Sequence, residues 1–337
     1  MKFATAALSG VALMALMAGS ASAADLACLI TKNNTNPFFV KMKEGAEAAA
    51  ATAGLDFQAY AGEKDGDAAP QITAIENCIA AGAKGILITP SNDSVGPALK
   101  DARAVGILVI ALDTPLADGE AQDITFATDN FEAGLLIGKW AAATMGEGAA
   151  TAKIAMLDIN KDNISVDVQR DTGFLVGFGI EVPDLSVMGS ETDARVIGHE
   201  TSDANPEGGL RAMETLLAKD PDINVVYTIN EPAAEGAYQA LKNAGKEAQA
   251  IIVSVDGGCP GVASVKSGVI GATSQQYPLK MAGLGIEAIA AFAKDGTKPT
   301  VTEGLSFFNT GVNLVTDKPA EGVPSIDSAK GTELCWG

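Results

Sequence analysis

Residues 31–42 read Thr-Lys-Asn-Asn-Thr-Asn-Pro-Phe-Phe-Val-Lys-Met and connect an apolar run at 26–30 to an alanine- and glutamate-rich stretch. The apolar run is typical of a buried strand and the alanine-rich stretch of a helix, so the segment predicts a strand-to-helix turn. Asn36 and Pro37 suit the cap and first position of that helix, with both phenylalanines entering the core. A second interpretation places the asparagines and both rings in a ligand site, because parallel α/β sheets bind ligands beyond the carboxyl ends of their strands.

The composition is that of a globular, acidic protein. The chain has 337 residues, of which 47% are hydrophobic and 37 are glycine. That length is enough for two domains of ordinary size. The formal charge is −19 at pH 7, from 23 basic and 42 acidic residues. Nucleic acids and anionic membrane surfaces both require clustered basic residues, so the composition argues against either partner.

The first 23 residues have the pattern of a secretory signal peptide. Lys2 precedes an apolar stretch at 6–18, and residues 20–23 read Ser-Ala-Ser-Ala, which supplies an Ala-x-Ala cleavage site. The apolar stretch is shorter than the ~20 residues of a spanning helix. We therefore expect cleavage after Ala23, export, and no membrane insertion of the mature chain.

Four cysteines, at positions 28, 78, 259 and 335, allow three disulfide pairings in an exported protein. Cys28 lies on the first predicted strand, and Cys78 lies on a helix that is expected to cross back over that strand. This placement favours a bond between Cys28 and Cys78, which leaves Cys259 and Cys335 as the second pair. Buried free thiols are the alternative.

Short apolar runs alternate with amphipathic stretches along the mature chain. The predicted strands are 26–30, 55–60, 85–89, 107–112, 124–127, 152–157, 184–189, 223–228, 250–255 and 269–272, with an extended tail at 305–314. The predicted helices are 37–53, 68–81, 94–105, 130–146, 166–179, 206–219, 232–244, 261–267 and 278–294. This rhythm predicts parallel sheets, and ten strands are many for one open sheet. We therefore predict two doubly wound, Rossmann-like α/β domains, with chain crossings near 127–129, 276–277 and 305–310 that form a hinge.

Nearly every predicted strand ends in planar polar side chains. Those at or soon after strand ends include Lys32, Asn36, Asn92, Asp113, Asp158, Asn160, Arg170, Asn230, Asp256 and Gln276. Carboxylates accept hydroxyl protons, arginine donates in a fork and amides do both. With Phe38 and Phe39 as an aromatic platform, the set suits a small, uncharged, polyhydroxylated ligand. Asparagine and aspartate are also common turn and cap residues, so each position has a purely structural alternative.

Six motifs follow one another along the mature chain. They are Lys-x-x-x-Asn-Pro-Phe-Phe at 32–39, Leu-Asp at 112–113, Arg-x-x-Gly-Phe at 170–174, Asn230, Asp-Gly at 256–257 and Gln-x-Pro at 276–278. As an ordered set they resemble the periplasmic sugar-binding proteins of bacterial ABC importers, in the ribose, allose and galactose group. The opening stretch and the even cysteine count look most like the fructose-import binding proteins of that group.

The resemblance implies a type I periplasmic binding protein fold. One domain would comprise residues 24–127 plus 277–309 and the other residues 128–276 plus 310–337. The protein would be a periplasmic monomer without enzymatic activity, cofactor or metal. It would capture one monosaccharide, fructose or a related hexose or pentose, and deliver it to the membrane subunits of an ABC importer.

The resemblance also implies roles for individual residues. Phe38 and Phe39 would stack on the sugar ring, while Asp113 and Arg170 would clamp its hydroxyls and ring oxygen. Further ligand contacts would come from Lys32, Asn36, Thr89, Thr114, Asn230, Asp256 and Gln276. Thr89, Thr114 and Ala204 stand where the ribose-type pattern has asparagine, arginine and phenylalanine. These smaller residues leave more room, which favours a hexose or ketohexose over a pentose.

An enzyme is the main competing class, and its usual motifs fail. The chain has no GxSxG, its single histidine, His199, lies in a polar stretch that predicts a surface residue, and Gly134 and Gly138 have the wrong spacing for a phosphate loop. The paired carboxylates of a glycosidase stay open as an alternative. So does a binding protein for a non-sugar polyol or signal molecule.

Two further readings find little support in the sequence. Asp158-x-Asn160-x-Asp162 matches the start of a calcium loop, but Asn163 and Gln169 stand where glycine and a bidentate acid are required. A transcription factor of the same fold would carry a helix-turn-helix in place of the signal-peptide pattern. We therefore expect neither a calcium site nor DNA binding.

Overall fold

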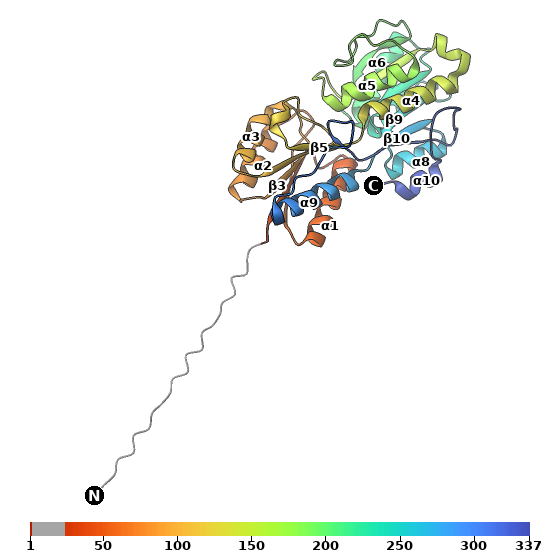
Figure 1. The fold of residues 1–337 in the computed structure, drawn as a ribbon. Coiled ribbons are helices and arrows are strands. Elements are labelled where there is room, and N and C mark those ends of the chain that lie inside the picture. Colours follow the sequence, from red (N-terminus) through yellow and green to blue (C-terminus); the bar gives the residue numbers. More distant parts are fainter. Residues whose placement is uncertain (2–23) are drawn as a thin grey trace.

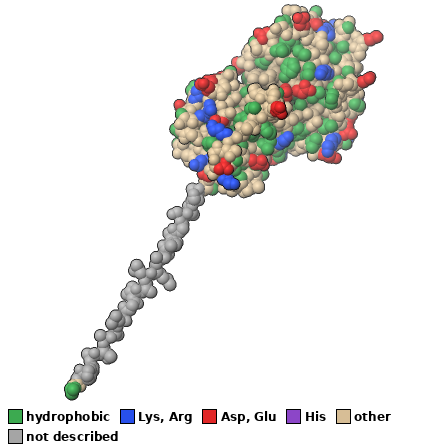
Figure 2. Space-filling model, in the orientation of Figure 1, with side chains coloured by type: hydrophobic (Ala, Val, Ile, Leu, Met, Phe, Trp, Pro, Cys, Tyr) green, Lys and Arg blue, Asp and Glu red, His purple; other side chains and the backbone are tan. Residues whose placement is uncertain are grey.

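The computed structural model describes Met1 and residues 24–337, and they form two lobes (Figure 1). Apart from Met1, the predicted signal peptide lies outside the described residues. In the described part of the chain, no helix is both long and apolar enough to cross a membrane. On the face in Figure 2, lysine and arginine side chains lie in small groups among acidic ones.

The first lobe is built on a parallel sheet with the strand order β11-β5-β4-β3-β1-β2. Its strands are β1 (Leu26–Thr31), β2 (Asp56–Ala61), β3 (Gly85–Ile88), β4 (Leu108–Leu112), β5 (Ile124–Ala127) and β11 (Phe308–Asn309). The central strands β1, β3 and β4 are buried along almost their whole length. Burial on both faces explains why they read in the sequence as continuous apolar runs.

The second lobe has a sheet with the order β12-β10-β9-β8-β6-β7. Its strands are β6 (Ile154–Asp158), β7 (Val196–Thr201), β8 (Val225–Thr228), β9 (Ile251–Asp256), β10 (Ala272–Gln275) and β12 (Asn313–Val315). All pairs are parallel except β10 with β12, which is antiparallel. The two sheets therefore have corresponding strand orders.

Helices cover both faces of each sheet. The first lobe has α1 (Pro37–Ala53) and α9 (Pro278–Asp295) on one face, and α2 (Ala69–Ala80) and α3 (Gly96–Ala104) on the other. The second has α4 (Asn130–Met145) and α5 (Ser165–Phe178) opposite α6 (Pro206–Lys219), α7 (Glu231–Asn243) and α8 (Cys259–Ser267), with α10 (Ser328–Leu334) beside α8. Short 3₁₀ helices lie at η1 (Asp93–Val95), η2 (Gly119–Ala121) and η3 (Gly146–Thr151). The predicted fold, with two doubly wound sheets that each carry helices on both faces, is confirmed.

Helix α1 shows how local sequence sets an element. The Asn36 side chain accepts a hydrogen bond from the backbone N–H of Phe38, and Pro37 occupies the first turn. The helix ends at Gly54, which adopts φ 69° and ψ 29°. This left-handed conformation is the usual C-terminal stop and favours glycine. The helix predicted at 37–53 therefore begins and ends where the sequence indicates.

The chain passes between the lobes three times. It crosses after β5 at residues 128–129, after β10 at 276–277, and between β11 and β12 at 310–312. The first two passages coincide with predicted crossings, and the third lies at the end of the predicted 305–310 segment. The predicted disulfide pairing is also confirmed, with bonds joining Cys28 to Cys78 and Cys259 to Cys335.

The strand predicted at 184–189 is wrong. The Asp184 side chain accepts hydrogen bonds from the backbone and hydroxyl of Ser186, so the chain turns there instead of extending. The strand that pairs with β6 is β7, Val196–Thr201, whose residues are all only half-buried. An edge strand of this kind needs little apolar sequence, which explains why it was missed.

Two differences concern the C-terminal part. The strand predicted at 269–272 begins only at Ala272, because the Val269 N–H bonds back to Ser264 at the end of α8. The true strand is largely polar and fully buried, and Ser274 donates its hydroxyl to the Ala133 carbonyl. Helix α10 was not predicted; its seven residues, Ser-Ala-Lys-Gly-Thr-Glu-Leu, give too short a pattern.

Candidate functional site

A cavity lies between the lobes, where the carboxyl ends of both sheets meet. Its lining comprises Lys32, Asn36, Phe38, Phe39, Asp65 and Asp113 from the first lobe, Ile159, Val166, Arg170, Ala204, Ile229, Asn230 and Asp256 from the second, and Gln276 from a crossing. Nine of the eleven predicted ligand-binding residues are among them. Strand ends of both doubly wound sheets thus converge on one site, as the fold permits.

The two phenylalanines at the start of α1 form one wall. Their ring centroids lie 5.4 Å apart at an interplanar angle of 78°, and both side chains are buried. Trp336 packs against the Phe38 ring at 5.5 Å and donates its indole N–H to the Gln276 carbonyl at 2.7 Å. The structural interpretation of the opening stretch is confirmed, because Asn36 caps the helix and both rings enter the core. These three residues also line the cavity, so their role as ligand contacts stays a prediction.

Arg170 connects the parts of the site. Its Nε donates to Asn130 Oδ1 at 2.8 Å, Nη1 to the Ile229 carbonyl at 3.1 Å and Nη2 to Gln276 Oε1 at 3.3 Å. Nη2 also lies 3.7 Å from Asp113 Oδ1, a residue of the other lobe. The side chain is only 5% exposed, so this ion pair is largely shielded from water.

Asp256 ends β9 and faces the same guanidinium. Its Oδ1 accepts a hydrogen bond from Gln276 Nε2 at 2.8 Å. Burial raises the pKa of Asp256 to about 6, although the charge of Arg170 and the Gln276 hydrogen bond oppose the shift. Asn230 also lines the cavity; its Nδ2 donates to the Ala204 carbonyl and its Oδ1 caps α7.

Lys32 and Asp65 form a second charged pair in the cavity. Lys32 Nζ lies 4.0 Å from Asp65 Oδ1, and the lysine side chain is only 2% exposed. Burial raises the pKa of Asp65, while the charge of Lys32 lowers it. Asp65 was missed because it lies in a charged turn, Glu63-Lys64-Asp65-Gly66-Asp67, where nothing distinguishes it from a solvated acid.

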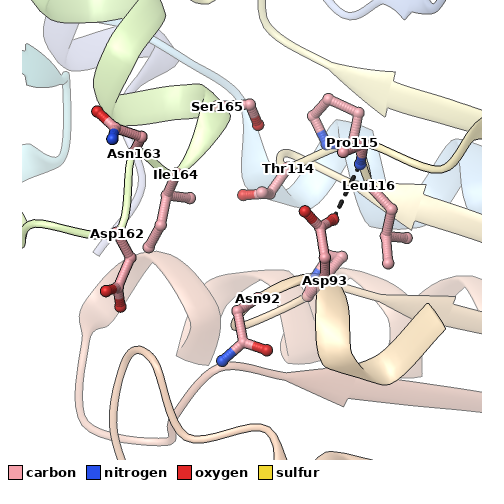
Figure 3. Close-up of a pocket in the computed structure, with 11 residues that line it drawn as sticks. Asn92, Asp93, Thr114, Pro115, Leu116, Asp162, Asn163, Ile164 and Ser165 are labelled. Carbon is pink, nitrogen blue, oxygen red and sulfur yellow. Dashed lines mark hydrogen bonds between the residues drawn. The ribbon is translucent and has the colours of Figure 1, made fainter. Parts of the chain in front are cut away.

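Thr89 and Thr114 do not line the cavity. The Thr89 hydroxyl accepts a hydrogen bond from the Lys32 backbone, and Thr114 donates its hydroxyl to Asp113 Oδ2 at 2.8 Å. Thr114 instead lines a neighbouring pocket, where residues that follow β3 and β4 face the loop 162–165 of the other lobe (Figure 3). Both threonines therefore position residues of the cavity and do not reach it.

Three residues of the cavity have unusual backbone conformations. Asp113, Ala204 and Asp256 have positive φ angles of 64°, 53° and 142°. Non-glycine residues rarely adopt such angles, and they concentrate at functional sites. Two of the three are the carboxylates that flank Arg170, so backbone strain and charge coincide in the cavity.

Several apolar and supporting residues of the site were not predicted from the sequence. Ile159, Val166 and Ile229 line the cavity, Asn130 holds Arg170, and Trp336 lies behind Phe38. Ile159 and Ile229 directly follow the buried ends of β6 and β8, and their position was a usable signal. No sequence signal marked Asn130 or Trp336, because neither directly follows a predicted strand. Asn130 is the first residue of α4, and Trp336 is the penultimate residue of the chain.

His199, which the sequence predicts to be a surface residue, is half-buried. Its side chain is 20% exposed, and its two ring nitrogens each lie 2.9 Å from a carboxylate oxygen, of Asp158 and of Glu191. Burial by itself lowers the pKa of His199, but these hydrogen bonds and the nearby charges raise it to about 11. His199 does not line the cavity between the lobes.

Two α/β lobes with a polar cavity between them define the class of bilobal solute-binding proteins. A family model described as "Periplasmic binding protein domain" matches residues 27–298, and the chain belongs to this family. A ribose import binding protein RbsB of Haemophilus influenzae is 32% identical over 287 residues, covering 85% of this chain and 91% of that protein. The D-allose-binding periplasmic protein of Escherichia coli is 25% identical over 297 residues, covering 86% and 91%.

Solved structures agree with this fold. A carbohydrate transporter solute-binding protein of Agrobacterium radiobacter, in complex with D-arabinose, superposes with a TM-score of 0.76 at 23% identity, covering 94% of this chain and 99% of that chain. The type I periplasmic binding protein fold and the resemblance to sugar-binding proteins of ABC importers are thus confirmed. The names of these relatives mention ribose, allose and arabinose and not fructose, so the fructose assignment stays a prediction.

Proposed function

We propose that this protein captures a monosaccharide in the cavity between its lobes and delivers it, in the periplasm, to an ABC importer. The observation that carries the proposal is the convergence of two aromatic rings, a forked arginine, three amides and several carboxylates on one buried site. Hydroxyl groups need both donors and acceptors, and an aromatic ring offers a face for the apolar side of a sugar. Relatives that are named as ribose- and allose-binding proteins support this class of ligand.

The charges of the cavity favour a neutral ligand. Lys32 and Arg170 face three carboxylates, those of Asp65, Asp113 and Asp256. Each cation lies within 4.0 Å of a carboxylate that already belongs to the protein. An acidic sugar or a sugar phosphate would meet no free positive charge in the lining, whereas hydroxyl groups can insert between paired groups.

Closure of the lobes is the proposed mechanism. The two moving domains would be residues 24–127 plus 277–309 and residues 128–276 plus 310–337, with signal cleavage after Ala23. The contact between Arg170 and Asp113 joins the lobes and would be made only when the cleft closes. A sugar that bridges the same groups would shift the equilibrium toward the closed form, which a monomeric protein presents to the importer.

The ligand is proposed to be fructose or a related hexose or pentose. Ala204 lines the cavity with a small side chain where the ribose-type pattern has phenylalanine, which favours a six-carbon over a five-carbon sugar. A glycosidase is the alternative, since Asp113 and Asp256 are two carboxylates in one site. We propose binding without catalysis, because both acids are engaged by Arg170 or Gln276 and the named relatives are transport proteins.

The test is calorimetric titration of the purified protein with fructose, ribose, allose, galactose, glucose, mannose and inositol. We expect one of these compounds to bind at one molecule per chain and to be recovered unchanged. The protein must first be freed of copurified ligand by unfolding and refolding. Absence of heat with the whole panel would overturn the sugar assignment, and conversion of the bound sugar would establish the enzyme.

Sugar affinity is expected to depend on pH through Asp256. An ionised carboxylate is the better acceptor of hydroxyl protons, and burial raises the pKa of Asp256 to about 6. At pH 5 only about a tenth of such groups are ionised, so affinity should be about tenfold weaker than at pH 7.5. Titrations at both pH values measure this ratio. In Asp256→Asn the affinity should be low at both values and the ratio close to one; a persistent tenfold ratio would assign the effect to another group.

A further inference from the structure

A second cluster of polar groups is buried in the second lobe, away from the cavity. It combines the carboxylates of Asp158 at the end of β6, Asp167 and Asp171 on α5, and Glu191 in the loop before β7 with the imidazole of His199 on β7. We call these five residues the acid–histidine cluster. None of them lines the sugar cavity.

The centre of the cluster is the imidazole ring. His199 Nδ1 lies 2.9 Å from Asp158 Oδ2 and 3.5 Å from Asp171 Oδ2, while Nε2 lies 2.9 Å from Glu191 Oε1. The relative exposures of the three carboxylate side chains are 5%, 0% and 5%. In residues 24–337, every ion pair made by these three carboxylates is with His199. Several buried negative charges therefore share one cationic partner.

The cluster is also short of hydrogen bonds. Twelve buried side-chain polar atoms of the described residues lack a hydrogen-bond partner, and five of them belong to this cluster. They are Asp158 Oδ1, Asp167 Oδ1, both carboxylate oxygens of Asp171 and Glu191 Oε2. Buried polar atoms without partners are rare in native proteins and call for an unseen water or ion. Asp171 is the clearest case, since its side chain is wholly buried and points at the histidine.

We propose that Asp158, Asp171 and His199 bind a divalent transition metal of the zinc class. Their three ligand atoms all lie within 4.8 Å of one another. Zinc binds carboxylate and imidazole atoms at about 2.0–2.2 Å, which places neighbouring tetrahedral ligands about 3.3 Å apart. The two Nδ1–Oδ2 separations, 2.9 and 3.5 Å, lie on either side of that value.

Glu191 supplies the supporting contact that such sites require. A histidine bound to metal through one ring nitrogen usually donates its other N–H to a carboxylate, which fixes the ring. With the metal on Nδ1, Nε2 donates to Glu191 Oε1, and the 2.9 Å separation fits this bond. A metal here neutralises buried charge and gives a direct bond to Asp171, whose two oxygens accept no hydrogen bond. The His199 side chain is 20% exposed, and we expect the metal to enter from this side.

The donor set excludes calcium and magnesium as the preferred ion. Both bind mainly oxygen ligands, calcium six to eight of them, whereas an imidazole is typical of zinc, nickel and copper sites. The neighbouring calcium-like sequence does not form a site: Asn160 Oδ1 accepts the Asp162 backbone N–H in a turn, and Asp158 faces His199. The nearest competing arrangement is a protonated imidazole among the same carboxylates.

The proposed metal would join three elements around the sugar site. It would tie the end of β6, the middle of α5 and the edge strand β7 (α5 is labelled in Figure 1). Arg170 precedes the ligand Asp171 on α5 and reaches the sugar cavity. The metal would therefore brace the helix that carries the central arginine.

Metal binding is to be measured on the full chain, purified without a histidine tag and stripped with EDTA. We expect one Zn²⁺ per chain in a competition titration with a fluorescent chelator, and visible absorption bands when Co²⁺ replaces it. Because His199 is the only histidine in the protein, its ring nitrogens can be followed by NMR after histidine-specific ¹⁵N labelling. Zinc should shift the Nδ1 signal strongly in the unaltered protein, which makes this readout independent of any variant.

Variants then assign the ligands. Asp171→Asn and His199→Gln should abolish the cobalt bands, whereas Glu191→Gln should weaken zinc binding about 10- to 100-fold. Asp162→Asn, in the adjacent loop, is the matched control and should bind normally. If the unaltered protein binds neither ion, or the Nδ1 signal does not move, the cluster holds only a proton and the metal site is excluded. Binding that persists in both ligand variants would exclude this location.

Discussion

Replacing Arg170 with methionine is expected to weaken sugar binding by about two to four orders of magnitude. A guanidinium has five N–H donors, and three of them are used by Asn130, Ile229 and Gln276. Two donors remain for the ligand, and hydrogen bonds to charged groups contribute about 1.5–3 kcal/mol each. Their loss amounts to about 3–6 kcal/mol, which corresponds to about 10²- to 10⁴-fold in Kd. Calorimetric titration with the sugar identified from the panel measures this change.

The matched control for that variant is Arg195→Met. Arg195 is partly buried and likewise makes several hydrogen bonds through its guanidinium. Its donors go to Asp193 and to the carbonyls of Ala149 and Gly179, and it does not line the cavity. Its replacement should lower the melting temperature while leaving the sugar Kd within about twofold. If both variants lose affinity equally, the effect of Arg170 is one of stability and the arginine is not a ligand contact. If Arg170→Met binds normally, the arginine is removed from the site.

The parts of the fold that the sequence predicts are those set by local chemistry. Helix α1 starts at an asparagine cap and a proline and stops at a left-handed glycine, and all three signals lie within 19 residues. Buried central strands such as β4 read as unbroken apolar runs, since both of their faces are covered. Strand β7 could not be found in this way, because an edge strand is specified by its pairing with β6 and carries half-buried side chains.

The same division applies to the candidate site. Residues at strand ends could be predicted, because parallel topology brings all carboxyl ends to one edge. Asp65 and Trp336 could not, since one comes from a charged turn and the other from the chain terminus. Thr89 and Thr114 occupy the right sequence positions but turn their hydroxyls to the Lys32 backbone and to Asp113. Side-chain direction depends on neighbours that are distant in sequence.

The role of Gly134 and Gly138 can be recognised only once the packing of α4 against α5 is known. In the sequence, their spacing shows only that they do not form a phosphate loop. In the structure they face Gly173 and Gly177 on α5, and a Cβ at any of the four would overlap a backbone carbonyl oxygen of the opposite helix. The four glycines therefore allow α4 and α5 to pack backbone against backbone. Gly134 lies directly against the carbonyl oxygen of Arg170, so this packing also positions the central arginine.

Gly134→Ala is accordingly expected to cost about 3 kcal/mol or more, since the added methyl meets main chain that cannot move aside as a flexible side chain can. The melting temperature should fall by about 6 °C or more, and sugar affinity should fall as well because Arg170 moves with its helix. Gly283→Ala on α9 is the matched control: nothing lies within 4 Å of its Cβ position. Removing that helical glycine should stabilise the protein by about 0.5–1 kcal/mol. Thermal unfolding of both variants, followed by sugar titration, compares them directly. Equal melting temperatures of the two variants would show that α4 can shift away from α5 at little cost. Unchanged sugar affinity in a destabilised Gly134→Ala variant would show that the helix contact contributes to stability but does not determine the position of Arg170.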